Sequence, residues 1–241
     1  EEQGIEVFYL GVDRYGRIDI NELDSKITES TALISLQHAN SETGVLQDIK
    51  QVSEIARNKG VLFHTDAVQS VAKIPFDLKK TPVDMLSISG HKFNGPKGVG
   101  ALYLKKGTAA LFSPVCGGGQ EKKRRGGTEN VPGIIGFGKA CDLAVLRMSK
   151  KSQIGDLRDY FLNRIYETIP GVNLFGDKIN RLPNTLNIGF EGLAGDTLLI
   201  ALDLDGVAVS TGSACSSGTG LPSHVLQAMG IPDEITIAPF V

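Results

Sequence analysis

The chain has 241 residues, 41% hydrophobic and 22% charged, and its 25 Lys and Arg against 27 Asp and Glu leave a formal charge of −2. This near balance argues against a nucleic-acid binder, because no strong positive field concentrates phosphates around the protein. No apolar run reaches the roughly 18 residues that a membrane-spanning helix needs. We therefore expect a soluble globular protein with a buried core and neither a nucleic-acid nor a membrane partner.

Four short apolar runs predict strands in the first half of the chain, at 31–36, 61–63, 85–89 and 99–104. Between the first two, an amphipathic stretch over 48–58 predicts a helix that Asp48 caps and Gly60 ends. Strands that are apolar throughout, joined by a helix, are typical of a parallel sheet covered on its faces. Ligands bind such sheets at the carboxyl ends of the strands. The polar residues expected just past those ends are His64, Asp66, Gln69, Ser89, His91 and Lys92.

The second half of the chain has a different pattern, with a break at Pro170-Gly171. Periodicity predicts helices at 132–148, 152–169, 195–204 and 222–229, and strands at 185–190 and 207–210. We expect a large α/β domain over residues 1–150 and a smaller α+β domain over residues 151–241.

Three cysteines, Cys116, Cys141 and Cys215, form no CxxC pair and no Cys/His cluster at zinc-ligand spacing. We therefore expect no metal site, no disulfide framework and a reducing, cytoplasmic compartment. Cys141 lies in an apolar helical pattern and is expected to be buried. Cys215 lies among small and polar residues, where it is either an incidental thiol in a turn or a nucleophile on a mobile loop.

Two residues near the predicted strand ends have chemistry that depends on their combination. Lys92 alone is either a solvated loop lysine or an amine that forms a Schiff base. Asp66 alone is either a helix cap or a carboxylate that pairs with a protonated ring nitrogen, as pyridoxal phosphate (PLP) requires. One crossover separates them, so their strands are neighbours, and together they favour the cofactor.

The basic run 122–125, followed by Gly126-Gly127-Thr128, also has two interpretations. Four basic residues in a row are usually a solvated loop. The glycine amides, the Thr128 hydroxyl and an arginine could instead bind a phosphate, although the spacing is not that of a P-loop.

Five motifs, in order and spacing, resemble the cysteine desulfurases of the NifS/IscS type, within the class-V aminotransferase-like family. The motifs are 38–44 (HANSETG), 64–70 (HTDAVQS), 87–98 (SISGHKFNGPKG), 125–128 (RGGT) and 213–217 (SACSS). The resemblance implies the PLP-dependent transferase fold (fold-type I), with a mostly parallel sheet in the large domain and a smaller α+β domain. It also implies a homodimer that takes sulfur from L-cysteine, leaves L-alanine and hands the sulfur to an acceptor protein for iron–sulfur cluster or thio-cofactor synthesis.

The resemblance also implies a role for each matching residue. Lys92 would form the Schiff base with PLP and move the Cα proton, and Cys215 would attack the substrate sulfur and become a persulfide. Asp66 would hold the pyridine nitrogen protonated. Gln69 and the Asn40-Ser41 pair would contact the ring oxygen. Ser89 and His91 would contact the phosphate, joined there by Thr128 of the partner subunit.

The sequence departs from the family at three places. The family usually has a second Asn where this chain has Ser41. Its phosphate-wrapping segment and ring-stacking His would precede Glu1, and its carboxylate-binding Arg would follow the Pro232-Asp233-Glu234 segment. We therefore expect a chain that is incomplete at both ends relative to the family.

Other functions compete with this interpretation. A degenerate homologue or fragment would serve as a non-catalytic dimerisation or docking module. A selenocysteine lyase would use the same residues on another substrate. An aminotransferase of the same fold type would keep Lys92 and Asp66 and would not use Cys215.

Overall fold

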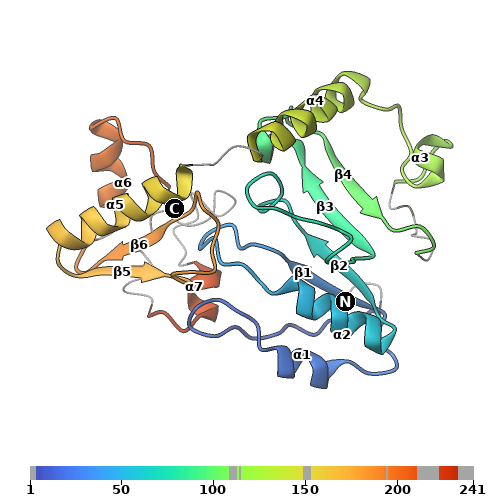
Figure 1. Ribbon diagram of the computed structural model, residues 1–241, viewed down its shortest axis with the longest axis horizontal. Coiled ribbons are helices and arrows are strands. Elements are labelled where there is room, and N and C mark those ends of the chain that lie inside the picture. Colours follow the sequence, from blue (N-terminus) through green and yellow to red (C-terminus); the bar gives the residue numbers. More distant parts are fainter. Residues whose placement is uncertain are drawn as a thin grey trace.

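The computed structural model describes residues 4–108, 113, 115–148, 153–193, 195–210 and 223–232. Its main sheet has the order β1-β2-β3-β4, and a two-stranded sheet pairs β5 with β6 (Figure 1). The first three strands are parallel, and β4 is antiparallel to β3. The predicted strand–helix–strand unit is therefore present. The strands are β1 Leu33–Gln37, β2 Leu62–Asp66, β3 Met85–Ser89, β4 Gly100–Leu104, β5 Val172–Phe175 and β6 Asn187–Phe190.

The helices at 49–59, 131–148, 154–168, 195–204 and 224–228 follow predicted segments closely, whereas those at 20–26 and 120–123 were not predicted. Asp48 caps α2 by accepting a hydrogen bond from the Gln51 amide at 3.0 Å, and Gly60 ends it in the left-handed region at φ 71°. The α-helices are α1 Ile20–Lys26, α2 Ile49–Lys59, α3 Gln120–Lys123, α4 Val131–Met148, α5 Ile154–Thr168, α6 Gly195–Leu204 and α7 His224–Ala228, and one 3₁₀ turn, η1, spans Gly90–Phe93. No helix of these described segments is both long and apolar enough to cross a membrane.

The core of the main sheet lies under α1 and α2. Side chains alternate along each strand, so Phe63 of β2 and Ile34 of β1 point to this face and are buried with Val52 and Ala56 of α2. Burying each large apolar side chain in this way contributes about 1.5 to 3 kcal/mol. Helix α4 lies on the other side of the molecule and packs against η1 (Figure 1).

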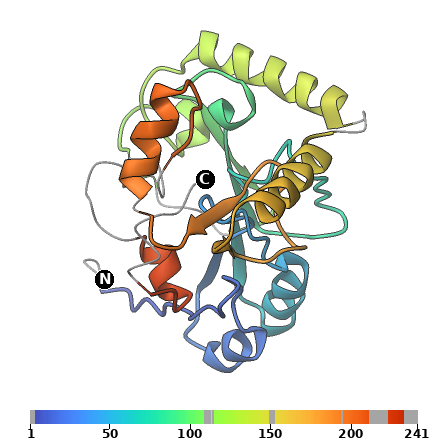
Figure 2. The same cartoon turned by 90° about the vertical axis from the view of Figure 1, so that its left-hand side faces the viewer.

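The second sheet has its own core, which α5 and α6 flank (Figure 2). The loop between its two strands is joined to the loop after β1, because the Leu182 amide donates to the Gly44 carbonyl at 2.8 Å. A Cβ at Gly44 would lie 2.8 Å from the Cβ of Thr185, so this approach requires glycine. Val12 packs with Leu226 near the C-terminal end. The division at residue 150 stays a prediction, and contacts cross it from both sides.

Two details of the predicted elements were wrong. Residues 207–210 form no strand, because the Val207 amide donates to the Leu202 carbonyl and so ends α6 rather than joining a sheet. His64, Asp66 and Ser89 were expected just past strand ends, but His64 lies within β2, and Asp66 and Ser89 are the last residues of β2 and β3. The apolar pattern understated β2 because its last three residues, 64–66, are polar.

Candidate functional site

Asp66 and Lys92 lie at the same edge of the main sheet. Asp66 ends β2, and it pairs in register with Ser87 on the parallel neighbour β3. Ser89 ends β3, and η1 follows at once with Lys92 in its single turn. The carboxyl ends of parallel strands thus bring an exposed carboxylate and an exposed amine to one edge.

Packing explains why η1 presents its polar residues outward. Phe93 is buried against α4, with its ring centroid 5.6 Å from that of Phe137. A Cβ at Gly90 would lie 2.9 Å from the Phe137 ring, so only glycine allows the turn to approach α4 so closely. His91 and Lys92 lie between these two anchors and are exposed.

Ser89 and His91 form a hydrogen-bonded pair beside Lys92. The Ser89 hydroxyl lies 2.9 Å from Nδ1 of His91. One hydrogen of the pair is used in this contact, so a hydroxyl and a neutral imidazole held in this way leave one donor, on Oγ or on Nε2, for an anionic oxygen. Their position at the start of η1 suits a phosphate group at this edge.

Gln69 and Lys73 extend the site along the segment after β2. Oδ1 of Asp66 accepts a hydrogen bond from the Val68 amide at 2.9 Å, which fixes the start of this turn. Further along, the Lys73 ammonium donates to Oε1 of Gln69 at 3.1 Å. Burial, and secondarily the positive charge of Lys92, lower the pKa of Lys73. Sequence analysis did not single out Lys73; its only signal was a lysine four residues after Gln69.

Two histidines near this edge have structural roles in the sheet. His64 bridges three strands, with Nδ1 2.8 Å from the Ser35 hydroxyl and Nε2 2.9 Å from the Ser87 hydroxyl. Both its ring nitrogens are thereby engaged. Burial lowers its pKa, although the charge of Asp66 partly opposes this. Buried His38 bonds Ser70 through Nδ1 at 2.9 Å, and burial lowers its pKa to about 4.

The remaining predicted residues lie on other loops. Asn40 is buried, and its side-chain oxygen accepts from the amides of Glu42 and Thr43 at 2.9 and 3.0 Å. Only the Asn40 amide nitrogen is therefore left to contact a ligand, and the neighbouring Ser41 is exposed. Thr128 is exposed, in the segment between α3 and α4.

Cys215 lies outside the described residues, so its predicted role is not placed by the structure. The other two thiols are unpaired. Cys116 is exposed, and Cys141 packs beside Phe93, where burial raises its pKa. Within the described part of the chain, no group of three or more His, Cys, Asp or Glu residues is arranged to hold a metal ion.

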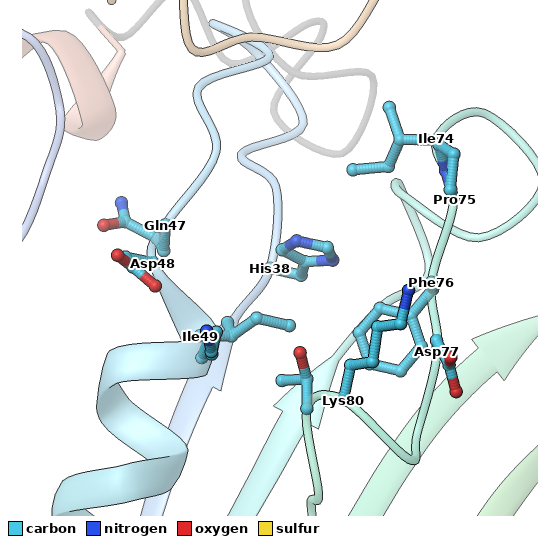
Figure 3. Close-up of a pocket in the computed structure, with 11 residues that line it drawn as sticks. His38, Gln47, Asp48, Ile49, Ile74, Pro75, Phe76, Asp77 and Lys80 are labelled. Atoms are coloured by element: carbon cyan, nitrogen blue, oxygen red, sulfur yellow. The ribbon is translucent and has the colours of Figure 1, made fainter.

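A cavity of about 830 Å³ lies beside this edge, between the start of α2 and the segment 74–81 (Figure 3). His38 and Phe76 face into it, with ring centroids 5.5 Å apart. Neither Asp66 nor Lys92 lines this cavity. We place the site at the sheet edge and not in the cavity. An amine, a carboxylate and polar groups that can contact a phosphate lie together at that edge.

The chemical groups at this edge are of the kinds that PLP needs. The Lys92 amine suits the cofactor's aldehyde, the Asp66 carboxylate suits a protonated ring nitrogen, and the Ser89 and His91 pair suits its phosphate. Each group lies at the same sheet edge, on an element fixed by packing.

The chain belongs to the class-V aminotransferase family, whose sequence pattern matches residues 1–232. Within it, the chain is 50% identical over 236 residues to the cysteine desulfurase IscS of Dictyoglomus turgidum, covering 98% of this chain and 60% of that protein. A solved NifS-like protein superposes with a TM-score of 0.89 at 37% identity, covering 99% of this chain and 62% of that one. A solved structure described as SspA in complex with cysteine has a TM-score of 0.83 at 33% identity, covering 99% and 66%.

The comparisons confirm the resemblance to NifS/IscS-type cysteine desulfurases and the fold-type I architecture expected from it. The chain spans about 60% of the length of the curated relatives it matches. The activity, substrate and partners of the whole protein are therefore treated below as proposals.

Proposed function

We propose that the protein is a PLP-dependent cysteine desulfurase, which converts L-cysteine to L-alanine and transfers the sulfur to Cys215. The observation that carries this proposal is the meeting of Asp66 and Lys92 at the ends of neighbouring strands, with Ser89 and His91 paired beside them. The named relatives support it, since the first is a cysteine desulfurase and another solved relative binds cysteine.

The residues of the sheet edge would hold the cofactor and handle protons. Asp66 would keep the ring nitrogen protonated, because its negative charge favours the cationic form of a partner. Ser89 and His91 would contact the phosphate, and Gln69 would donate to the ring's phenolic oxygen. Lys92 would hold the cofactor and move the proton at the substrate's Cα. When bound, PLP withdraws electrons from that carbon.

Cys215 would act as the nucleophile toward sulfur. Its thiolate would attack the sulfur of the substrate cysteine, so that an S–S bond forms as the substrate's Cβ–S bond breaks. The electron pair of the broken bond returns to the substrate carbon, which is protonated on the way to alanine. The sulfur then remains on Cys215 as a persulfide, ready for an acceptor.

The test uses the protein at its full natural length. Lys92→Ala is expected to abolish the visible absorbance of bound PLP, whereas Cys215→Ala is expected to keep the absorbance and lose sulfide release from L-cysteine. Lys106→Ala, at an exposed lysine after β4, is the matched control and should change neither. Retained cofactor absorbance in Lys92→Ala would refute the assignment of Lys92.

The same assays separate the competing functions. Keto-acid formation without alanine would support an aminotransferase. Alanine from selenocysteine and not from cysteine would support a selenocysteine lyase. Failure of the full-length protein to bind PLP would support a non-catalytic docking module.

The assembly and setting are part of the proposal. We infer a homodimer, in which Thr128 of the partner subunit would complete the phosphate contacts, and a sulfur-acceptor protein as the second partner. Exposed apolar residues on α4, such as Ile135 at 68% and Val145 at 70%, are consistent with a subunit interface. The free thiols of Cys116 and Cys141 are consistent with a reducing cytoplasm.

A further inference from the structure

Lys73 is unusual among the lysines of this protein. Of the lysines in the described residues, it is the only one that is not exposed. Removing an ammonium from water is costly unless another group compensates. We therefore expect the half-buried Lys73 to have a role that offsets this cost.

The backbone before Lys73 is held in an unfavourable conformation. Ala72 has φ 65°, in the left-handed region that a residue with a Cβ rarely adopts. Such a conformation is unfavourable and persists only where the surroundings enforce it. Here Val71 and Ala72 pack against the cluster around Phe93, the residue after Lys92. The strained turn thus ties the segment bearing Lys73 to the turn bearing Lys92.

The contact between Lys73 and Gln69 selects one orientation of the Gln69 amide. An ammonium has three donors and no acceptor, so the oxygen of the amide must face it. The structure has this arrangement, with Nζ of Lys73 3.1 Å from Oε1 of Gln69. The Nε2 group, which carries two N–H donors, must then point away from Lys73.

We propose that Lys73 is a positioning residue, which fixes the Gln69 amide so that Nε2 donates to the anionic ring oxygen of the cofactor. The inference rests on the proposed function, because that function supplies the ring oxygen. A flipped amide would present its own oxygen to the cofactor oxygen, and the two would repel. Lys73 prevents the flip without touching the cofactor.

The surrounding charges agree with this role. Burial is the larger cause of the lowered pKa of Lys73, and the charge of Lys92 adds to it. The two ammonium groups therefore lie within electrostatic range of each other, in one polar region. The hydrogen bond to Gln69 offsets part of the cost of placing Lys73 there.

The first experiment measures the affinity of the full-length protein for PLP by absorbance titration. Lys73→Met is expected to weaken binding about five- to tenfold, which is the net effect of losing one typical hydrogen bond. Lys73→Arg keeps a donor and is expected to stay within about twofold of the parent. Lys79→Met, at an exposed lysine on the same segment, is the matched control. Unchanged affinity in Lys73→Met, or equal losses in the Met and Arg variants, would overturn the inference.

A double-mutant cycle shows whether Lys73 acts through Gln69. In a Gln69→Leu background, Lys73→Met is expected to cause no further loss of affinity and no further shift of the bound cofactor's absorbance maximum. Additive losses would overturn the inference, because Lys73 would then act on the cofactor independently of Gln69.

A measurement without cofactor separates this inference from the proposed function. In the ¹⁵N-glutamine-labelled protein, the Gln69→Leu spectrum identifies the Gln69 side-chain NH₂ signals by their loss. Lys73→Met is expected to move those signals toward the values of a solvated amide, and no movement would overturn the inference. If the protein fails to bind PLP while the signals move, the proposed function fails and the orienting contact is supported.

Discussion

The buried histidine His38 makes a prediction about stability against pH. Its side chain is enclosed between Ser70 and Phe76, and the residue is 8% exposed. The Ser70 hydroxyl donates to the Ala67 carbonyl at 3.3 Å, so it accepts from Nδ1 of a neutral imidazole. Burial penalises the charged ring, so the folded state favours the neutral one and the pKa falls from 6.5 to about 4.

The sign and size of the effect follow from linkage. Below pH 6.5 the unfolded chain takes up a proton on His38, whereas the folded protein does not do so until about pH 4. Stability therefore falls as the pH drops through this range, and the contribution of His38 changes no further below it. At about 1.4 kcal/mol for each pH unit, the free energy of unfolding should fall by about 3 kcal/mol.

Urea unfolding followed by circular dichroism, at several values between pH 7 and pH 4, measures this slope. His38→Gln loses ring packing and is expected to be less stable at pH 7, but its stability should fall by about 3 kcal/mol less than that of the parent on acidification. His224→Gln, at an exposed histidine at the start of α7, should keep the parental slope. Parallel pH profiles for His38→Gln and the parent would refute the reasoning.

Two further substitutions test how the site is held. Gly90→Ala would place a Cβ 2.9 Å from the Phe137 ring and 3.1 Å from the Val99 carbonyl oxygen; we expect a loss of about 1 to 3 kcal/mol in unfolding free energy and weaker PLP binding, and parental melting would contradict this. Ser223 caps α7 and donates to the buried carboxylate of Glu42 at 2.5 Å, so Ser223→Ala should lower the free energy of unfolding by about 2 to 3 kcal/mol, whereas Ser223→Thr should largely preserve it. Equal melting temperatures for the Ala variant and the parent would count against the contact.

Local pattern was enough for most of the elements because their signals lie within a few residues. The Asp48 cap and the Gly60 stop both bound α2 as predicted. Segment 207–210 misled because short apolar runs look alike whether or not a partner strand is available. Strand β5 was not predicted, since its four residues gain their stability from pairing with β6.

The site divides in the same way. Asp66 and Lys92 could be predicted because strand order follows from connectivity, and parallel strands end at one edge. The Lys73 contact with Gln69 could not, because it depends on the strained turn at Ala72 that packs on the Phe93 cluster. The Glu42 contact with Ser223 joins residues 181 positions apart, with no local trace of either partner in the sequence.

The sequence by itself determined the family, the mixed α/β architecture and the chemical identity of the residues at the sheet edge. Those properties depend on motifs and periodicities that span a few residues each. Only the tertiary structure decided which groups touch. In that structure the Asn40 oxygen accepts hydrogen bonds within its own loop, and both ring nitrogens of His64 have partners. Lys73 is half-buried and bonds to Gln69. Burial and hydrogen-bond partners depend on packing between distant segments, and the sequence order does not record it.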